Sequence, residues 1–185
     1  MKDLINKSIN QHSEFLKHID KAKIIDSANI ILDALNKGKT IFWCGNGGSA
    51  SQANHLSAEL VGGMYQQKNK PFRSICLNVD SAFITAWSND DSFENIFVRQ
   101  LEAIGQSEDI LIGLSTSGNS SNIVKAAQFA LSNKIKVISL TGNNGGNLKE
   151  YSDINMNIKT SNTQRIQEIH ILIGHILCDI IEQSL

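Results

Sequence analysis

The stretch from Thr40 to Glu59 carries residues whose types and spacing could bind an anion and move a proton. It reads as a short apolar run, a glycine turn at Gly45–Ser49 and then a helix. His55 and Glu59 are four residues apart, so they share one face of that helix. Free N–H groups at a helix N-terminus favour anions, so we expect a small anionic ligand at the turn, with acid–base or metal chemistry nearby. A plain surface hydrogen bond is the alternative reading of the pair, and its place beside the turn favours function.

A second loop gathers hydroxyl side chains directly after the apolar run 110–114. No Lys or Arg lies within this loop, so an anion there would be held by neutral donors at the start of a helix. The sequence favours a phosphate site, and the alternative is a helix N-cap with spare serines. The hydroxyl residues are Ser115, Thr116, Ser117 and Ser120.

The glycine turn also satisfies the dinucleotide fingerprint G-x-G-x-x-G/A over Gly45–Ala50. That fingerprint expects an acidic residue about twenty positions later, at the end of the next strand. The acid that ends the next apolar run is Asp80, thirty-five residues after Gly45. This misfit disfavours a nicotinamide cofactor, and no Gly-Lys-Ser/Thr follows to make a nucleotide P-loop.

The elements that must position these loops follow from hydrophobic periodicity. Helices are expected at 3–19 and 21–36, the second with Asp20 as its N-cap and Gly38 as its stop. Apolar runs at 41–44, 74–79, 110–114, 137–140 and 154–158 predict strands. Helical stretches near 48–64, 92–104 and 119–132, a short turn near 81–87, a Gly/Asn loop with a turn at 141–152 and a final helix at 164–183 complete the chain.

Strands that alternate with helices predict a parallel sheet covered on both faces. The expected fold is therefore α/β: a three-layer, doubly wound, five-stranded parallel sheet with an N-terminal helical hairpin. We expect a single domain over 1–185, with the helical pair at 1–37 and the α/β core at 38–185. Ligands bind at the carboxyl ends of such strands. Ser88-Asn89-Asp90 is expected to form a third loop at this edge, besides the glycine and hydroxyl loops. The polar loop Gln66–Lys70 leads into the second strand.

Bulk properties exclude several classes of function. The 185-residue chain has a net charge of −1 and no Lys/Arg run, so we expect no nucleic-acid or membrane partner. Nothing resembles a signal peptide or a membrane span of about 18 apolar residues, so the sequence predicts a cytoplasmic protein. Cys44, Cys76 and Cys178 have no metal-binding spacing and are expected to be buried free thiols.

The two terminal helices carry the remaining signals. Gln167 and His175 lie eight residues apart on one stripe of the final helix, where a buried structural histidine is the ordinary explanation of His175. The first helix has a narrow apolar stripe, and the final helix is apolar over much of its circumference. Together they offer more apolar surface than one small sheet covers, which predicts a homotetramer.

These motifs, taken in order, resemble a known family. The sequence is similar to the sugar isomerase (SIS) domain superfamily, and specifically to the phosphoheptose isomerase (sedoheptulose 7-phosphate isomerase) family. The motifs that carry this resemblance are Cys44–Ser49, His55 with Glu59, Asn89-Asp90, Ser115–Ser120 and Arg165–His170. The resemblance covers nearly the whole chain. The position before Asn89 departs from the pattern, because Ser88 stands where the family often has Gly.

The resemblance implies a flavodoxin-like SIS fold and an aldose–ketose isomerase. Its reaction would convert sedoheptulose 7-phosphate to D-glycero-D-manno-heptose 7-phosphate through an enediol, as the first step toward nucleotide-activated heptoses of lipopolysaccharide or capsule. It further implies a homotetramer with active sites between subunits. The implied catalytic residues are Glu59 and His175. The implied ligands of one zinc ion per subunit are His55, Glu59, Gln167 and His175. The implied substrate-binding residues are Asn46, Gly47, Gly48, Glu59, Asn89, Asp90, Ser115, Thr116, Ser117, Ser120 and Gln167.

Two alternatives stay within the same superfamily. One is a non-catalytic tetramer that binds the bacterial replication initiator protein, and it is disfavoured because that group lacks the acid and histidine found here at Glu59 and His175. The other is an isomerase of a different sugar phosphate.

Overall fold

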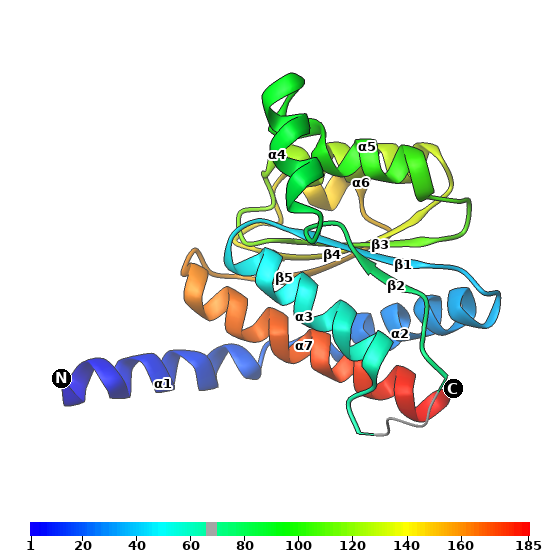
Figure 1. Cartoon of the computed structure of the whole chain (residues 1–185). Helices are drawn as coiled ribbons and strands as arrows, with labels where there is room; N and C mark the ends of the chain where they lie inside the picture. The colour runs from blue at the N-terminus through cyan, green and yellow to red at the C-terminus, as the bar shows by residue number, and fades with distance from the viewer. Residues whose placement is uncertain (66–69) are drawn as a thin grey trace.

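The computed structural model describes residues 1–65 and 70–185 and places a five-stranded sheet between two layers of helices (Figure 1). All four strand pairs are parallel, and the strand order is β2-β1-β3-β4-β5. The strands are β1 (Ile41–Gly45), β2 (Ser74–Cys76), β3 (Ile110–Ser115), β4 (Lys136–Gly142) and β5 (Ile154–Ile158). The predicted doubly wound sheet is confirmed. The order in which successive strands are added reverses between β1 and β3, which is where such folds bind ligands.

Helices cover both faces of the sheet. In Figure 1, α2, α3 and α7 lie below the sheet and α5 and α6 lie above it. The helices are α1 (Lys2–Leu16), α2 (Lys21–Asn36), α3 (Gly48–Gly62), α4 (Ser81–Asp90), α5 (Ile96–Ile104), α6 (Ser121–Ser132) and α7 (Thr163–Ser184), with 3-10 turns η1 (Phe93–Asn95) and η2 (Asn147–Tyr151).

Strand β1 shows why the apolar runs are continuous. Its side chains alternate between the two faces, with Ile41 and Trp43 in the core between the sheet and α2, α3 and α7. Phe42 and Cys44 lie in the core under α5 and α6. A strand buried on both faces needs apolar residues at every position, which removes the polar alternation of a half-exposed strand.

The N-terminal hairpin forms as expected. The Asp20 carboxylate accepts a hydrogen bond of 3.2 Å from the backbone N–H of Lys23 and caps α2, and Gly38 adopts φ +72° just beyond its end. Helix α1, in contrast, projects from the body of the protein (Figure 1) and has no buried residue. The side chains of Ile5 and Ile9 are each 58% exposed, so the apolar stripe of α1 is largely uncovered within one chain.

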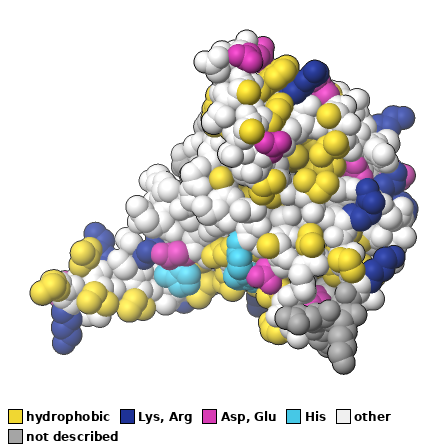
Figure 2. Space-filling view, in the orientation of Figure 1, with side chains coloured by type: hydrophobic (Ala, Val, Ile, Leu, Met, Phe, Trp, Pro, Cys, Tyr) yellow, Lys and Arg dark blue, Asp and Glu magenta, His cyan; other side chains and the backbone are white. Residues whose placement is uncertain are grey.

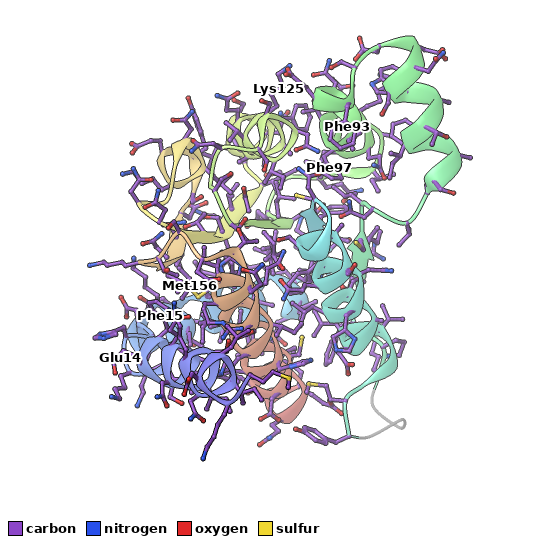
Figure 3. The ribbon with its side chains drawn as sticks, turned by 90° about the vertical axis from the view of Figure 1, so that its left-hand side faces the viewer. Glu14, Phe15, Phe93, Phe97, Lys125 and Met156 are labelled. Atoms are coloured by element: carbon purple, nitrogen blue, oxygen red, sulfur yellow. The ribbon has the colours of Figure 1, made fainter. Side chains whose placement is uncertain are left out.

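The segment between β2 and β3 differs from the expectation. The short turn expected near 81–87 is a full helix, α4, which begins because the Asp80 carboxylate accepts from the N–H of Phe83 at 2.9 Å. The helix expected over 92–104 starts instead as η1 and becomes α5 at Ile96. Lys125 of α6 contacts η1, with its Nζ 2.7 Å from the Glu94 carboxylate (Figure 3).

Strand β2 is also shorter than the apolar run 74–79. It ends at Cys76, and the side chain of Asn78 then takes over the pairing with β1: it accepts from the N–H of Gly45 at 3.1 Å and donates to its carbonyl oxygen at 2.8 Å. An amide side chain thus replaces a backbone ladder step. The expected loop Gln66–Lys70 lies outside the described residues except for Lys70.

The three cysteines are free and buried, as predicted. Burial raises the pKa of each thiol, that of Cys178 to about 12, so all three are protonated at neutral pH. No helix of the described residues is long and apolar enough to cross a membrane.

Candidate active site

The glycine turn and the hydroxyl loop meet at the carboxyl edge of the sheet. Strands β1 and β3 are neighbours, with Gly45 paired to Leu114, so the chain leaves both strands side by side. The predicted proximity of the two loops follows from this register. Two asparagine side chains join them: Asn46 donates to the Oδ1 of Asn122 at 2.8 Å, and Asn122 donates to the Oδ1 of Asn46 at 2.9 Å.

Glycine is required at two points of the first turn. A Cβ on Gly45 would lie 2.5 Å from the backbone carbonyl oxygen of Ser49, and Gly47 adopts φ +54°. Both positions allow the backbone to fold tightly into the start of α3 at Gly48. The N–H groups of the first turn of α3 are therefore presented at the same edge as the hydroxyl loop.

The hydroxyl loop is held in a compact form by its own polar groups. The hydroxyl oxygens of Ser115 and Ser120 are 3.0 Å apart, and Ser115 also accepts from the N–H of Gly118 at 3.1 Å. The hydroxyl of Ser117 accepts from the N–H of Asn119 at 3.1 Å. Gly118, at φ +67°, packs against the backbone of Gly145, which leaves no room for a side chain. The loop leads directly into α6, whose N-terminus favours an anion.

His55, Glu59 and His175 come together although 116 residues separate Glu59 from His175 in the chain. The Nε2 atoms of His55 and His175 are 2.9 Å apart, with the rings nearly perpendicular at 87°. The Oε1 of Glu59 lies 3.4 Å from the Nε2 of His55. Figure 2 shows histidine and acidic side chains side by side on the surface over α3 and α7. Two imidazole nitrogens and one carboxylate oxygen, each able to bind a metal ion or a proton, thus lie near one another at a solvent-accessible place.

This cluster depends on a close approach of α3 and α7. Gly174 lies against Leu56, and a Cβ on Gly174 would come within 2.7 Å of Leu56 Cδ2 and closer still to Cδ1. These two residues directly adjoin His175 and His55, so the contact sets the separation of the imidazoles. Gln52 of α3 adds a hydrogen bond of 2.6 Å to the carbonyl oxygen of Gln167 on α7.

Gln167 is placed differently from the other three predicted metal ligands. Its side-chain amide covers Gly48, where a Cβ would lie 2.7 Å from the amide nitrogen, and that nitrogen is 3.4 Å from the Ser49 hydroxyl. The side chain therefore lies against the glycine turn, with its polar contact to the first turn of α3.

The donor set of His55, Glu59 and His175 suits zinc chemically. Tetrahedral zinc with bonds of about 2.0–2.1 Å places its ligand atoms about 3.3 Å apart, close to the 2.9 and 3.4 Å seen here. Within the described part of the chain, however, no three or more His, Cys, Asp or Glu side chains are already arranged to hold a metal. The Nε2 atoms of the two imidazoles are in direct contact at 2.9 Å, and they would have to separate by about 0.4 Å to admit a tetrahedral ion between them.

Asn89 and Asp90 are not on a loop, contrary to the expectation. They form the last turn of α4, which protrudes at the top of Figure 1, and both are exposed. The Asn89 amide donates to the Asp90 carboxylate at 2.9 Å. Within one chain, α4 lies on the opposite side of the sheet from α3 and α7 (Figure 1).

Sequence reasoning missed several residues that support the site. Asn78, Gln52 and Asn122 bind through their side-chain amides, and single asparagines or glutamines carry no periodic signal. Gly174 did carry one, because an isolated glycine inside a helical pattern often marks a close packing contact. His170 was seen only as part of a motif; it is fully buried and lies 3.1 Å from the carbonyl oxygen of Thr141.

Comparisons with known proteins agree with this geometry. The model of the SIS domain family matches residues 6–142. The chain is 46% identical over 180 residues to a phosphoheptose isomerase of Helicobacter hepaticus, covering 93% of this chain and 91% of that protein. It is 40% identical over 187 residues to one of Nitratiruptor sp., covering all of both chains. A phosphoheptose isomerase structure from Neisseria gonorrhoeae superposes with a TM-score of 0.92 at 32% identity, over 99% of each chain. The chain therefore belongs to the SIS domain family and, within it, to the phosphoheptose isomerases.

Proposed function

We propose that this protein interconverts sedoheptulose 7-phosphate and D-glycero-D-manno-heptose 7-phosphate. The observation that carries the proposal is the His55–Glu59–His175 cluster on α3 and α7, together with the glycine turn at the start of α3 and the neighbouring hydroxyl loop. Aldose–ketose isomerisation needs a base at the carbons and a proton source for the oxygens. One carboxylate and two imidazoles supply these groups at one place.

The proposed steps move protons only. Glu59 removes a proton from C1 of the open-chain ketose while His175 protonates the C2 oxygen, which gives an enediol. Glu59 then returns its proton to C2 as His175 accepts the proton of the C1 hydroxyl, which gives the aldose. No external oxidant is needed, because C1 is oxidised as C2 is reduced.

The remaining predicted residues bind the substrate in this proposal. Ser115, Thr116, Ser117 and Ser120 hold the phosphate together with the N–H groups at the start of α6. Asn46, Gly47, Gly48 and Gln167 line the sugar. Asn89 and Asp90 end α4, which lies on the opposite side of the sheet from α3 and α7, so in this proposal they reach the sugar site of a neighbouring subunit.

Zinc is the proposed cofactor, with His55, Glu59, Gln167 and His175 as its ligands. Gln167, whose amide lies against the glycine turn, would have to turn toward the other three to bind the ion. When bound, it would polarise the sugar carbonyl. Metal analysis of protein purified without chelators tests this directly. We expect about one zinc per subunit and loss of most of that zinc in a His55→Ala variant; no zinc in the wild type after incubation with zinc salts contradicts the site.

A direct assay tests the reaction. Purified protein is incubated with sedoheptulose 7-phosphate, with and without added zinc, and the aldose product is followed by NMR. We expect conversion to an equilibrium mixture. Absence of turnover under both conditions contradicts the enzyme and would revive the initiator-binding alternative; turnover of only a pentose or hexose phosphate would indicate the other isomerases.

The product and the assembly complete the proposal. The heptose phosphate would enter the synthesis of nucleotide-activated heptoses for lipopolysaccharide or capsule. The buried free thiols support a reducing cytoplasm as the location. The exposed apolar stripe of α1 supports a homotetramer with active sites between subunits.

A further inference from the structure

Asn122 links the two ends of the substrate site without belonging to either loop's predicted ligand set. It lies in the first turn of α6, only 2% exposed, and exchanges two hydrogen bonds with Asn46 of the glycine turn. Its Oδ1 also accepts from the N–H of Ile123 at 3.0 Å. We propose that Asn122 is a positioning residue that fixes, through Asn46, the distance between the glycine turn and the hydroxyl loop.

A reciprocal amide pair is suited to this task. Each amide donates once and accepts once, so the pair fixes both the separation and the relative orientation of the two side chains. A buried amide without a partner is destabilising, which favours the single arrangement in which both amides are satisfied. Neighbouring apolar side chains, in contrast, could slide past each other at little cost.

The substrate makes that distance important. Its phosphate is on C7 and its reacting carbons are C1 and C2, so the two ends of an open seven-carbon chain must be held at once. A displacement of about 1 Å at the reacting end is enough to lower the rate about 100-fold. The inference rests on the roles proposed above for Asn46 and the hydroxyl loop.

The test combines a double-mutant cycle with a phosphate-binding measurement. The variants are Asn122→Ala, Asn46→Ala and their double. Asn133→Ala serves as the control, because it makes the same change at the exposed end of α6, where the Asn133 amide binds the carbonyl oxygen of Phe129 at 2.8 Å. For each protein, kcat and KM are measured with sedoheptulose 7-phosphate, and Kd is measured for inorganic phosphate, which probes the hydroxyl loop alone.

We expect Asn122→Ala to lower kcat by about 10- to 100-fold while the Kd for phosphate changes less than about threefold. Because Asn122 acts through Asn46, the double variant should be no slower than Asn46→Ala alone. Asn133→Ala should keep the wild-type kcat. A merely structural role would not produce this pattern, since it would weaken phosphate binding as well and add to the effect of Asn46→Ala.

Asn122→Asp provides a second route if the alanine variant folds poorly. It keeps the oxygen that accepts from Asn46 and Ile123 but replaces the donor to Asn46 with a second acceptor, so only one of the two hydrogen bonds of the pair can form. Its kcat at saturating substrate should lie between those of the wild type and Asn122→Ala. Additive losses in the double variant, or a phosphate Kd that weakens as much as kcat falls, would overturn the positioning role of Asn122 but leave the proposed function standing. Wild-type turnover by Asn46→Ala would overturn the role of Asn46 and this inference with it.

Discussion

At the scale of single residues, the Glu59 carboxylate is the proposed base and lies next to the imidazole of His55. Its side chain is 23% exposed, and its Oε1 lies 3.4 Å from the Nε2 of His55. Glu59→Gln keeps the size and removes the proton acceptor, so we expect kcat to fall by about 10²- to 10⁴-fold with the melting temperature nearly unchanged. Steady-state assays with sedoheptulose 7-phosphate check this.

The control for that change is Glu102→Gln on α5, where an exposed carboxylate lies 3.1 Å from Arg99. An exposed ion pair contributes only about 0–1 kcal/mol, so this variant should keep full activity. Wild-type kcat in Glu59→Gln would remove Glu59 as the base.

His170 gives a prediction about pH. Burial lowers its pKa from 6.5 to about 4, with the contact to the Thr141 carbonyl oxygen acting in the opposite direction. The unfolded chain therefore binds a proton between pH 6.5 and pH 4 that the folded chain does not. We expect the free energy of unfolding to fall by about 3 kcal/mol as pH drops through that window, and to be unaffected by this group above it.

Urea unfolding at fixed subunit concentration between pH 4 and 8 measures the effect. His170→Gln keeps a donor toward Thr141 and cannot titrate, so its stability should depend less on pH in that window. An identical pH profile for the two proteins would show that another group is responsible.

At the scale of elements, the approach of α3 to α7 decides whether the proposed catalytic groups meet. In Gly174→Ala the new methyl group collides with Leu56, which is fully buried and cannot turn outward. Alanine favours a helix over glycine by about 1 kcal/mol, whereas overpacking costs about 1–3 kcal/mol. We expect a net loss of stability of up to about 2 kcal/mol and a larger proportional loss of kcat, because His175 is pushed away from His55.

Gly62→Ala is the matched control for that prediction. It is also helical, but a Cβ there has no atom within 4 Å, so the variant should be as stable as the wild type or more so. Thermal unfolding and kcat of the two variants separate packing from helix propensity. A fully active and stable Gly174→Ala variant would contradict the packing argument.

At the scale of the whole molecule, α1 is attached mainly through its C-terminal half and α7. His12 lies 2.8 Å from Glu168, and Arg165 binds both Glu168 and the carbonyl oxygen of Ser8. The part of α1 before Ser8 extends beyond these contacts, and Figure 2 shows hydrophobic side chains along this arm. A polar anchor at one end and an uncovered apolar stripe at the other favour packing against another copy of the chain.

Ile9→Asp tests that assembly. Burial of an isoleucine side chain is worth about 1.5–3 kcal/mol, and the loss recurs in every copy, so we expect the proposed tetramer to dissociate and activity to fall. Ile25→Asp on α2, where the isoleucine is 57% exposed, is the comparison and should leave the tetramer intact. Light scattering and assays on both check the prediction, and a monomeric wild type would contradict it.

The fold could be read from the sequence because local patterns determine it. The apolar runs gave five strands, and Asp20 and Gly38 marked the limits of a helix correctly. The segment 81–104 was harder, since two capping residues, Asp80 and Ser92, divide it in a way that periodicity does not reveal. Periodicity therefore predicts a loop at Asn89 and Asp90, whereas these residues end a helix.

The site divides in the same way between sequence and structure. The glycine turn, the hydroxyl loop and the His55–Glu59 pair are local, because each is a short run whose backbone chemistry is set by its own residues. The meeting of His55 with His175 and of Asn46 with Asn122 was decided only by the tertiary structure. The Asn46–Asn122 contact depends on the β1–β3 register, and the His55–His175 contact depends on the close approach that Gly174 allows between α3 and α7. Both are relations between segments far apart in the chain, so no local pattern in the sequence reveals them.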